Sequence, residues 1–262
     1  MQNDLRLEAS PRPGARRRLS AVEVLCCGIG VGLILVGLSH LLALWAYPRP
    51  WLGPLSWRKP ITFGVSFGVV LLSITWVTSY LTMSSRLRGA LLSVFALDCV
   101  VEVAGVTIQA WRDVPSHFDT ANASDKVVAF SLAVGGAVLI VTLGAFAAAS
   151  LRAGVNASPP MQRAIRAGFL LLMAGLAAGI AMIVRGEQLI HSGHLTLAYN
   201  TAGFLKAFHG IALHAILVIP AIAWWLNRTR LTVARQLSLI NLTIAAYLLA
   251  AAVSLVICLS RV

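Results

Sequence analysis

The sequence is short of charge, and of acidic residues above all. Asp and Glu together number only 9 of 262 residues, against 21 Lys and Arg, which gives a formal net charge of +12. Hydrophobic residues make up 58% of the chain and the mean hydropathy is +0.84. No polar segment is long enough to bury a core of its own, which excludes a separate soluble domain. The apolar runs are instead long enough to cross a bilayer, which takes about 20 residues.

Lysine is nearly absent: the chain has 18 arginines but only three lysines, Lys59, Lys126 and Lys206. No basic run is interleaved with aromatic residues as a nucleic-acid surface requires, so we expect no nucleic-acid partner. We interpret the positive charge as a sign of membrane topology, with the lipid bilayer as the partner. The Arg- and Ala-rich composition is typical of a GC-rich bacterial genome, and it predicts a multi-pass protein of the bacterial inner membrane.

Several signatures of known chemistry are missing. The four cysteines, Cys26, Cys27, Cys99 and Cys258, form no CxxC pair, and no CxxCH motif is present, so neither a zinc or redox pair nor a covalent c-type haem is indicated. No GxxxxGK[ST] motif occurs, which argues against nucleotide-driven transport. The last apolar run has no lysine for a Schiff base, which argues against a retinal pump.

Seven apolar runs predict an all-α, polytopic bundle of seven transmembrane helices, since helices satisfy every backbone group within lipid. Residues 1–21 are expected to be a basic, disordered cytoplasmic tail, and residues 22–262 the transmembrane domain. The expected spans are Val22–Tyr47, Ile61–Thr82, Gly89–Ala110, Val127–Leu151, Ala164–Leu189, Ala202–Leu226 and Leu237–Leu259.

Basic residues in the connecting segments predict the orientation. With the N-terminus in the cytoplasm and the C-terminus outside, 13 of the 21 basic residues fall on the inner side. The outer side then holds three loops rich in Trp, Pro and His, at 48–60, 109–126 and 190–201. We expect the second of these, QAWRDVPSHFDTANASDK, to cover a polar cavity.

Ionisable residues inside a membrane span are costly and are therefore candidates for function. Asp98, Glu102 and Gln109 are separated by four and seven residues, so they share one face of the third span. This face is a proton or cation path, or it carries a carboxylate that faces a metal, or it carries one that pairs with Arg185 or Lys206 for packing alone.

The six histidines are expected in the outer half of the membrane spans or in the outer loops, except that His214 is placed as deep as the middle of its span. His40, His209 and His214 are candidate axial ligands of a haem b. Glu187, His191 and His194 have the i, i+4, i+7 spacing of one helical face, which suits a transition metal, although a solvated turn at the interface explains the same residues. The expected outward-facing cavity is lined by His40, Glu102, Gln109, Arg112, His117, Arg185, Glu187, His191, Lys206, His209 and His214.

Two functions follow from these residues. The first is a membrane redox protein that binds haem or a metal. The second is a proton-coupled transporter or membrane sensor without catalytic activity, in which Asp98 and Glu102 carry protons while Arg112, Arg185 and Lys206 meet an anion. An intramembrane metal hydrolase with SxxxH and HxxxH motifs is not indicated, because Ser39 and His40 are adjacent and His209 and His214 are five apart. A small-molecule or ion ligand at the outer face is expected in either case.

Overall fold

A computed structural model describes residues 19–51, 53, 55–115 and 122–260, and within these residues the fold is all-helical. Seven of its helices are long and apolar enough to cross a membrane, which confirms the expected all-helical fold with seven helices of spanning length. The expected tail lies almost wholly outside the described residues. The helices are α1 (Ala21–Ala46), α2 (Arg58–Val77) with the 3-10 turn η1 (Thr78–Tyr80), α3 (Ser85–Trp111), α4 (Ala123–Arg152), α5 (Pro159–His191), the short α6 (Leu195–Thr201), α7 (Lys206–Leu226) and α8 (Val233–Leu259).

Polar caps lengthen two helices beyond their apolar runs. The third and fourth spans were expected to begin at Gly89 and Val127, but α3 and α4 each begin four residues earlier. The side chain of Ser84 accepts a hydrogen bond from the third amide of α3, and that of Asn122 does the same for α4. Because these caps satisfy amides that a helix start leaves unpaired, the polar residues before each apolar run also become helical.

The segment 190–201, expected to be an outer loop, is mostly helical. The fifth span continues to His191, and α6 folds back after a short turn around Gly193, whose φ of 80° suits glycine. Ala198 of α6 is fully buried, so the short helix packs against the bundle. The sixth span therefore begins at Lys206 rather than at Ala202.

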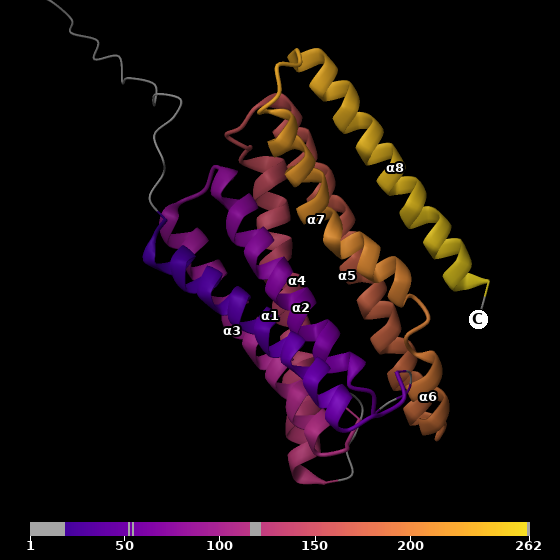
Figure 1. Ribbon diagram of the computed structural model, residues 1–262. Helices are drawn as coiled ribbons and strands as arrows, with labels where there is room; N and C mark the ends of the chain where they lie inside the picture. Colours follow the sequence, from indigo (N-terminus) through magenta and orange to yellow (C-terminus); the bar gives the residue numbers. More distant parts are fainter. Residues whose placement is uncertain (1–18, 52, 54, 116–121, 261–262) are drawn as a thin grey trace, which may run out of the picture.

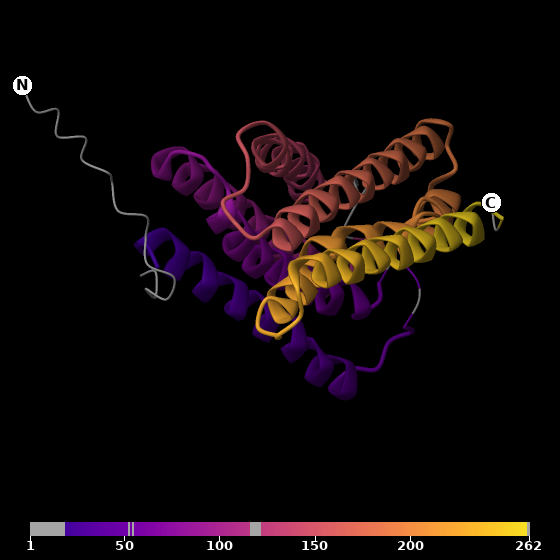
Figure 2. The ribbon, with the colours of Figure 1, turned by 90° about the horizontal axis from the view of Figure 1, so that it is seen from above.

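The bundle has two parts, which Figure 1 shows as the indigo and magenta helices α1 to α4 and the orange and yellow helices α5, α7 and α8. Contacts of α2 with α7 and of α4 with α5 join the parts, and α8 lies at the edge against α7 and α5 (Figure 2). The main hydrophobic core lies between them and includes the buried side chains of Leu71, Phe95, Phe146, Phe169 and Ile216.

Glycines allow α1 and α2 to pack almost backbone to backbone. A Cβ added to Gly64 would lie 2.6 Å from Cα of Gly37, and one added to Gly37 would lie 2.8 Å from the backbone nitrogen of Val65. Small residues at such crossings are typical of helices that associate within lipid, where close contact replaces the hydrophobic effect.

Arg88 joins several helices at one end of the bundle. We call this end, where α1, α3, α5 and α8 begin, the basic end, and the opposite end the α6 end. At the basic end Arg88 of α3 forms a buried ion pair with Glu23 of α1, with 2.7 Å between Nη2 and Oε1. Arg88 also donates to Oγ1 of Thr78 and to the carbonyl oxygen of Thr75, so one side chain joins three elements.

Candidate functional site

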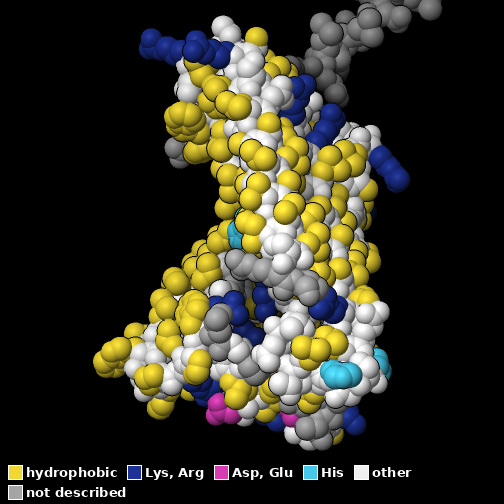
Figure 3. All heavy atoms as spheres, turned by 90° about the vertical axis from the view of Figure 1, so that its right-hand side faces the viewer, with side chains coloured by type: hydrophobic (Ala, Val, Ile, Leu, Met, Phe, Trp, Pro, Cys, Tyr) yellow, Lys and Arg dark blue, Asp and Glu magenta, His cyan; other side chains and the backbone are white. Residues whose placement is uncertain are grey.

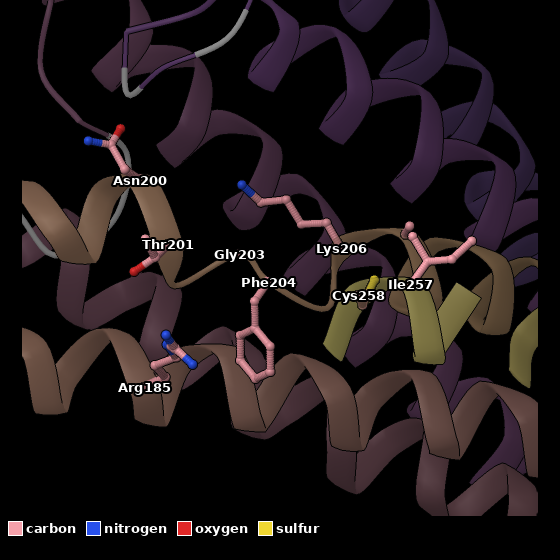
Figure 4. A pocket seen from close by; sticks show the side chains of 9 residues that line it. Arg185, Asn200, Thr201, Gly203, Phe204, Lys206, Ile257 and Cys258 are labelled. Atoms are coloured by element: carbon pink, nitrogen blue, oxygen red, sulfur yellow. The ribbon is translucent and has the colours of Figure 1, made fainter. Parts of the chain in front are cut away.

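A pocket of about 390 Å³ lies at the α6 end, where α5, α6, α7 and α8 meet. Figure 4 shows its side chains, which come from four helices and the link before α7. Arg185 and Lys206 supply positive charge, and Asn200 and Thr201 supply an amide and a hydroxyl. The remaining lining residues are Gly203, Phe204, Ala207, Ile257 and Cys258.

The local fold holds both cations at the pocket. The guanidinium carbon of Arg185 lies 4.9 Å from the centre of the Phe204 ring, a cation–π contact that orients the side chain. Lys206, the first residue of α7, lies across Gly203, where a Cβ would overlap its side chain. The link 202–205 therefore turns the chain and also gives the lysine its path along the pocket wall (Figure 4).

More positive charge stands beside this pocket. Arg58 and Lys59 open α2, and Lys59 is close enough to Arg58 and Lys206 for like-charge repulsion. Lys206 is in the same relation to Arg58. Figure 3 shows Lys and Arg side chains inside a hollow on this face of the molecule. Among the described residues no Asp or Glu lines the pocket, so the charged side chains known to line it are both positive.

The expected cavity residues do not share this pocket: of the predicted set, Arg185 and Lys206 line it. Arg112 instead forms an ion pair with the buried Asp125 of α4, with 2.6 Å between Nη1 and Oδ1. Gln109 donates from its side-chain nitrogen to the same Asp125 oxygen and accepts from Arg112. These three residues form a closed network that ties α3 to α4. His117 lies outside the described residues.

His40 is a buried packing residue with both ring nitrogens in use. Nε2 accepts a hydrogen bond from the indole nitrogen of Trp111 at 3.1 Å, so the proton lies on Nδ1, which donates to the carbonyl oxygen of Val36 at 2.7 Å. The ring lies among two tryptophans, 5.9 Å from Trp57 and 6.2 Å from Trp111 between centroids. Both ring nitrogens of His40 therefore serve hydrogen bonds within the protein.

The other two candidate haem ligands, His209 and His214, lie on α7. This helix packs against α5, α8 and α2, whereas α1, which carries His40, packs against α2 and α3. Nδ1 of His209 donates to the carbonyl oxygen of Gly175 on α5 at 2.7 Å, and the ring packs against Gly179. Nδ1 of His214 donates to the carbonyl oxygen of Gly210 in its own helix. His209 therefore joins α7 to α5 through the Gly175 carbonyl oxygen, beside Gly179, whose missing side chain leaves room for the ring.

Glu187 and His191 lie as their spacing predicts, because α5 extends through both. Oε2 of Glu187 is 3.9 Å from Nε2 of His191, and both side chains are largely exposed. His194 caps α6 and pairs its Nδ1 with the hydroxyl of Ser192. Within the described part of the chain, no group of three or more His, Cys, Asp or Glu side chains is placed to hold a metal ion.

Asp98, Glu102 and Gln109 are all buried on α3, as their spacing predicts. Asp98 and Glu102 do not meet Arg185 or Lys206. They face α4 at Gly135, in the other part of the bundle.

The sequence alone does not indicate Asn200, Thr201, Phe204 or Asp125 as site residues. Asn200 and Thr201 lie in a segment that the sequence predicts to be a loop but that forms α6, and Asp125 is the third residue of α4 rather than a loop residue. The Asn-x-x-Asp pattern at Asn122 was the available signal, since it is typical of a helix cap followed by an acidic first turn.

No family model, curated protein or solved structure matches this chain. The class of protein therefore rests on the chain itself, whose seven long apolar helices are compatible with a multi-pass membrane protein.

Proposed function

We propose that this protein is an integral membrane protein that binds an organic anion in the pocket at the α6 end, as a transporter or sensor without catalytic activity. The observation that carries the proposal is that Arg185 and Lys206 line one pocket, and that no carboxylate accompanies them among its described lining residues. Among the described residues, the acidic groups at this end are engaged elsewhere, Asp113 with Arg49, Asp125 with Arg112 and Glu187 with His191.

The pocket has the composition of a binding site for an anion with an apolar portion. A guanidinium and an ammonium provide charge-assisted hydrogen bonds to a carboxylate or phosphate, and Asn200 and Thr201 provide neutral donors. Phe204 and Ile257 offer an apolar wall to the remainder of the ligand. Sites of this volume with a few convergent polar groups are typical of small-molecule binding.

The orientation we propose puts this pocket outside the cytoplasm. The basic end carries most of the Arg residues in short links, and such links favour the cytoplasmic side. An anion-binding protein facing outward would meet its ligand before any step across the membrane.

Haem or metal binding has less support than anion binding. His40 uses both ring nitrogens within the protein, and His191 and Glu187 form an exposed pair with His194 bonded to Ser192. We therefore favour the transporter or sensor over the redox protein.

Direct binding to the detergent-purified protein tests the proposal, with inorganic phosphate and a medium-chain carboxylate as probes. Loss of one charge-assisted hydrogen bond costs about 1.5–3 kcal/mol, so Arg185→Gln and Lys206→Gln should each weaken binding by roughly tenfold or more. Arg228→Gln is the matched control, because Arg228 lies at the basic end over the ring of Trp224. Absence of binding, or equal losses in all three variants, would contradict the proposal. Uptake into reconstituted vesicles then separates a transporter from a sensor.

A further inference from the structure

Two carboxyl groups are buried side by side in the apolar part of α3. Asp98 and Glu102 lie one helical turn apart and are 6% and 4% exposed. Both reach Gly135 of α4, where an added Cβ would lie 2.8 Å from Oδ1 of Asp98 and 2.5 Å from Oε1 of Glu102. The absent side chain on α4 therefore makes the space that both carboxyls occupy.

This carboxyl pair differs from the other buried acids of the bundle. Glu23 is bound to Arg88 and Asp125 to Arg112, each in an ion pair of 2.7 Å or less. Neither Asp98 nor Glu102 has an ion pair among the described residues, and Oδ2 of Asp98 is a buried oxygen without a hydrogen-bond donor there.

The described helices around the pair bring no compensating charge to it. Helices α1, α2 and α4 pack against α3, and their ionisable groups other than cysteine lie toward their ends. These groups are Glu23, His40, Arg58, Lys59, Asp125, Lys126 and Arg152. Near the pair, Cys99 of α3 is within electrostatic range of both carboxyls, and Cys26 of α1 is within range of Cys99. Glu102 has Asp98 as its charged neighbour.

The pair lies beside a groove of about 320 Å³ on the outer surface of the bundle between α3 and α4. Asp98 and Ser131 supply the polar side chains of its lining. Gly135 also lines it, and the other lining residues are apolar. The rim residues Leu97 and Phe130 are 66% and 71% exposed, so the groove faces outward from the bundle, toward the bilayer.

We propose that Asp98 and Glu102 form an intramembrane proton-binding site that opens on this groove. Two carboxylates one turn apart repel each other, and burial without a counter-charge is costly, so a bound proton removes charge where no cation does so. The proton also gives one carboxyl a donor for an oxygen of the other. The site is separate from the anion pocket at the α6 end and does not depend on the function proposed for it.

A hydrophobic carbodiimide tests the proposal on the full-length, detergent-purified protein, because this reagent modifies carboxyls that carry a proton. We expect peptide mass spectrometry at about neutral pH to find Asp98 or Glu102 modified about tenfold more than Glu23 and Asp125, the equivalent of one pH unit in proton affinity. Glu23 and Asp125 are internal controls, since both are 1% exposed but paired with arginine. The unmodified wild-type chain suffices for this measurement, so no variant needs to fold.

Two further measurements decide the details. The yield of modification should fall as the pH of the reaction is raised from about 5 to about 10, because a deprotonated carboxyl does not react. A constant yield would overturn the proposal, because the pair would then be a permanently neutral packing element. A charged, water-soluble carbodiimide should modify the pair less than the hydrophobic one. Equal modification by both reagents would overturn the groove as the opening of the site, and equal modification of Glu23 and Asp125 would overturn the site itself.

Discussion

Trp111 donates its indole N–H to Nε2 of His40 over 3.1 Å, which ties the end of α3 to the last turns of α1. Trp57 lies against Trp111 with 4.9 Å between ring centroids and donates its own indole N–H to the carbonyl oxygen of Tyr47. Arg49 stacks on Trp57 at 4.2 Å. The histidine is therefore the polar centre of an aromatic cluster that closes the bundle at the α6 end.

His40→Ala should accordingly destabilise the protein by about 2–4 kcal/mol, because it leaves the Trp111 donor unpaired and opens a cavity. Thermal unfolding in detergent measures the loss, and tryptophan fluorescence reports the loosened cluster. His191→Ala is the control: its side chain is 84% exposed, and its effect should stay within about 0.5 kcal/mol. Equal midpoints for both variants would contradict the structural role of His40.

The ion pair between Glu23 and Arg88 makes a second stability prediction. Arg88→Gln should cost about 3–5 kcal/mol, because it removes the positive charge that the buried Glu23 carboxylate faces. Arg86→Gln, two residues earlier on an exposed part of α3, should have little effect. A double-mutant cycle with Glu23→Gln should show that the double variant loses less than the sum of the single losses. Additive losses would mean that the two side chains do not depend on each other.

The seven long apolar helices could be predicted from the sequence because apolar runs of this length have one stable form in lipid, whereas the short α6 could not. The spacing of Asp98, Glu102 and Gln109 also predicted correctly that all three would be buried on one face. Periodicity fixes which residues share a face of a helix, and run length fixes where a helix lies along the membrane normal.

The grouping of the polar residues could not be predicted, because the sequence gives the depth of a residue but not the neighbour that its face meets. Arg112 and Arg185 were both expected to line one cavity, yet Arg112 meets Asp125 while Arg185 meets Phe204. The outcome depends on how each helix is rotated, and close contacts between helices, such as that of Gly37 with Gly64, take part in setting this rotation.

Substitution at Gly64 tests this packing directly. Gly64→Ala should destabilise the bundle by about 1–3 kcal/mol, because the new Cβ would lie 2.6 Å from Cα of Gly37 and backbone atoms cannot turn aside. Gly32→Ala on α1 is the matched control, since a Cβ there meets nothing within 4 Å and alanine favours a helix. Unfolding midpoints of the two variants compare the sites, and a stable Gly64→Ala protein would show that α1 and α2 are not in contact here.

Gly135 and Gly136 offer a comparison that tests the surroundings of the carboxyl pair. Gly135→Ala would put a methyl group into the space that Asp98 and Glu102 occupy, whereas a Cβ on Gly136 meets nothing within 4 Å. Both substitutions replace glycine by alanine within α4, so the change in helix propensity is the same and favours the variants slightly. A difference between them therefore measures contact with the carboxyls.

We expect Gly135→Ala to lower the unfolding midpoint, with a cost of about 1–3 kcal/mol from overpacking, while Gly136→Ala leaves it equal or higher. Carbodiimide modification of Asp98 and Glu102 should change in Gly135→Ala alone, because the methyl group displaces the carboxyls from their place beside α4. If the two variants behave alike in both measurements, Gly135 does not face the carboxyls, and the packing of α3 on α4 must be revised. If only the midpoint differs, the glycine serves the helix contact and leaves the carboxyls where they were.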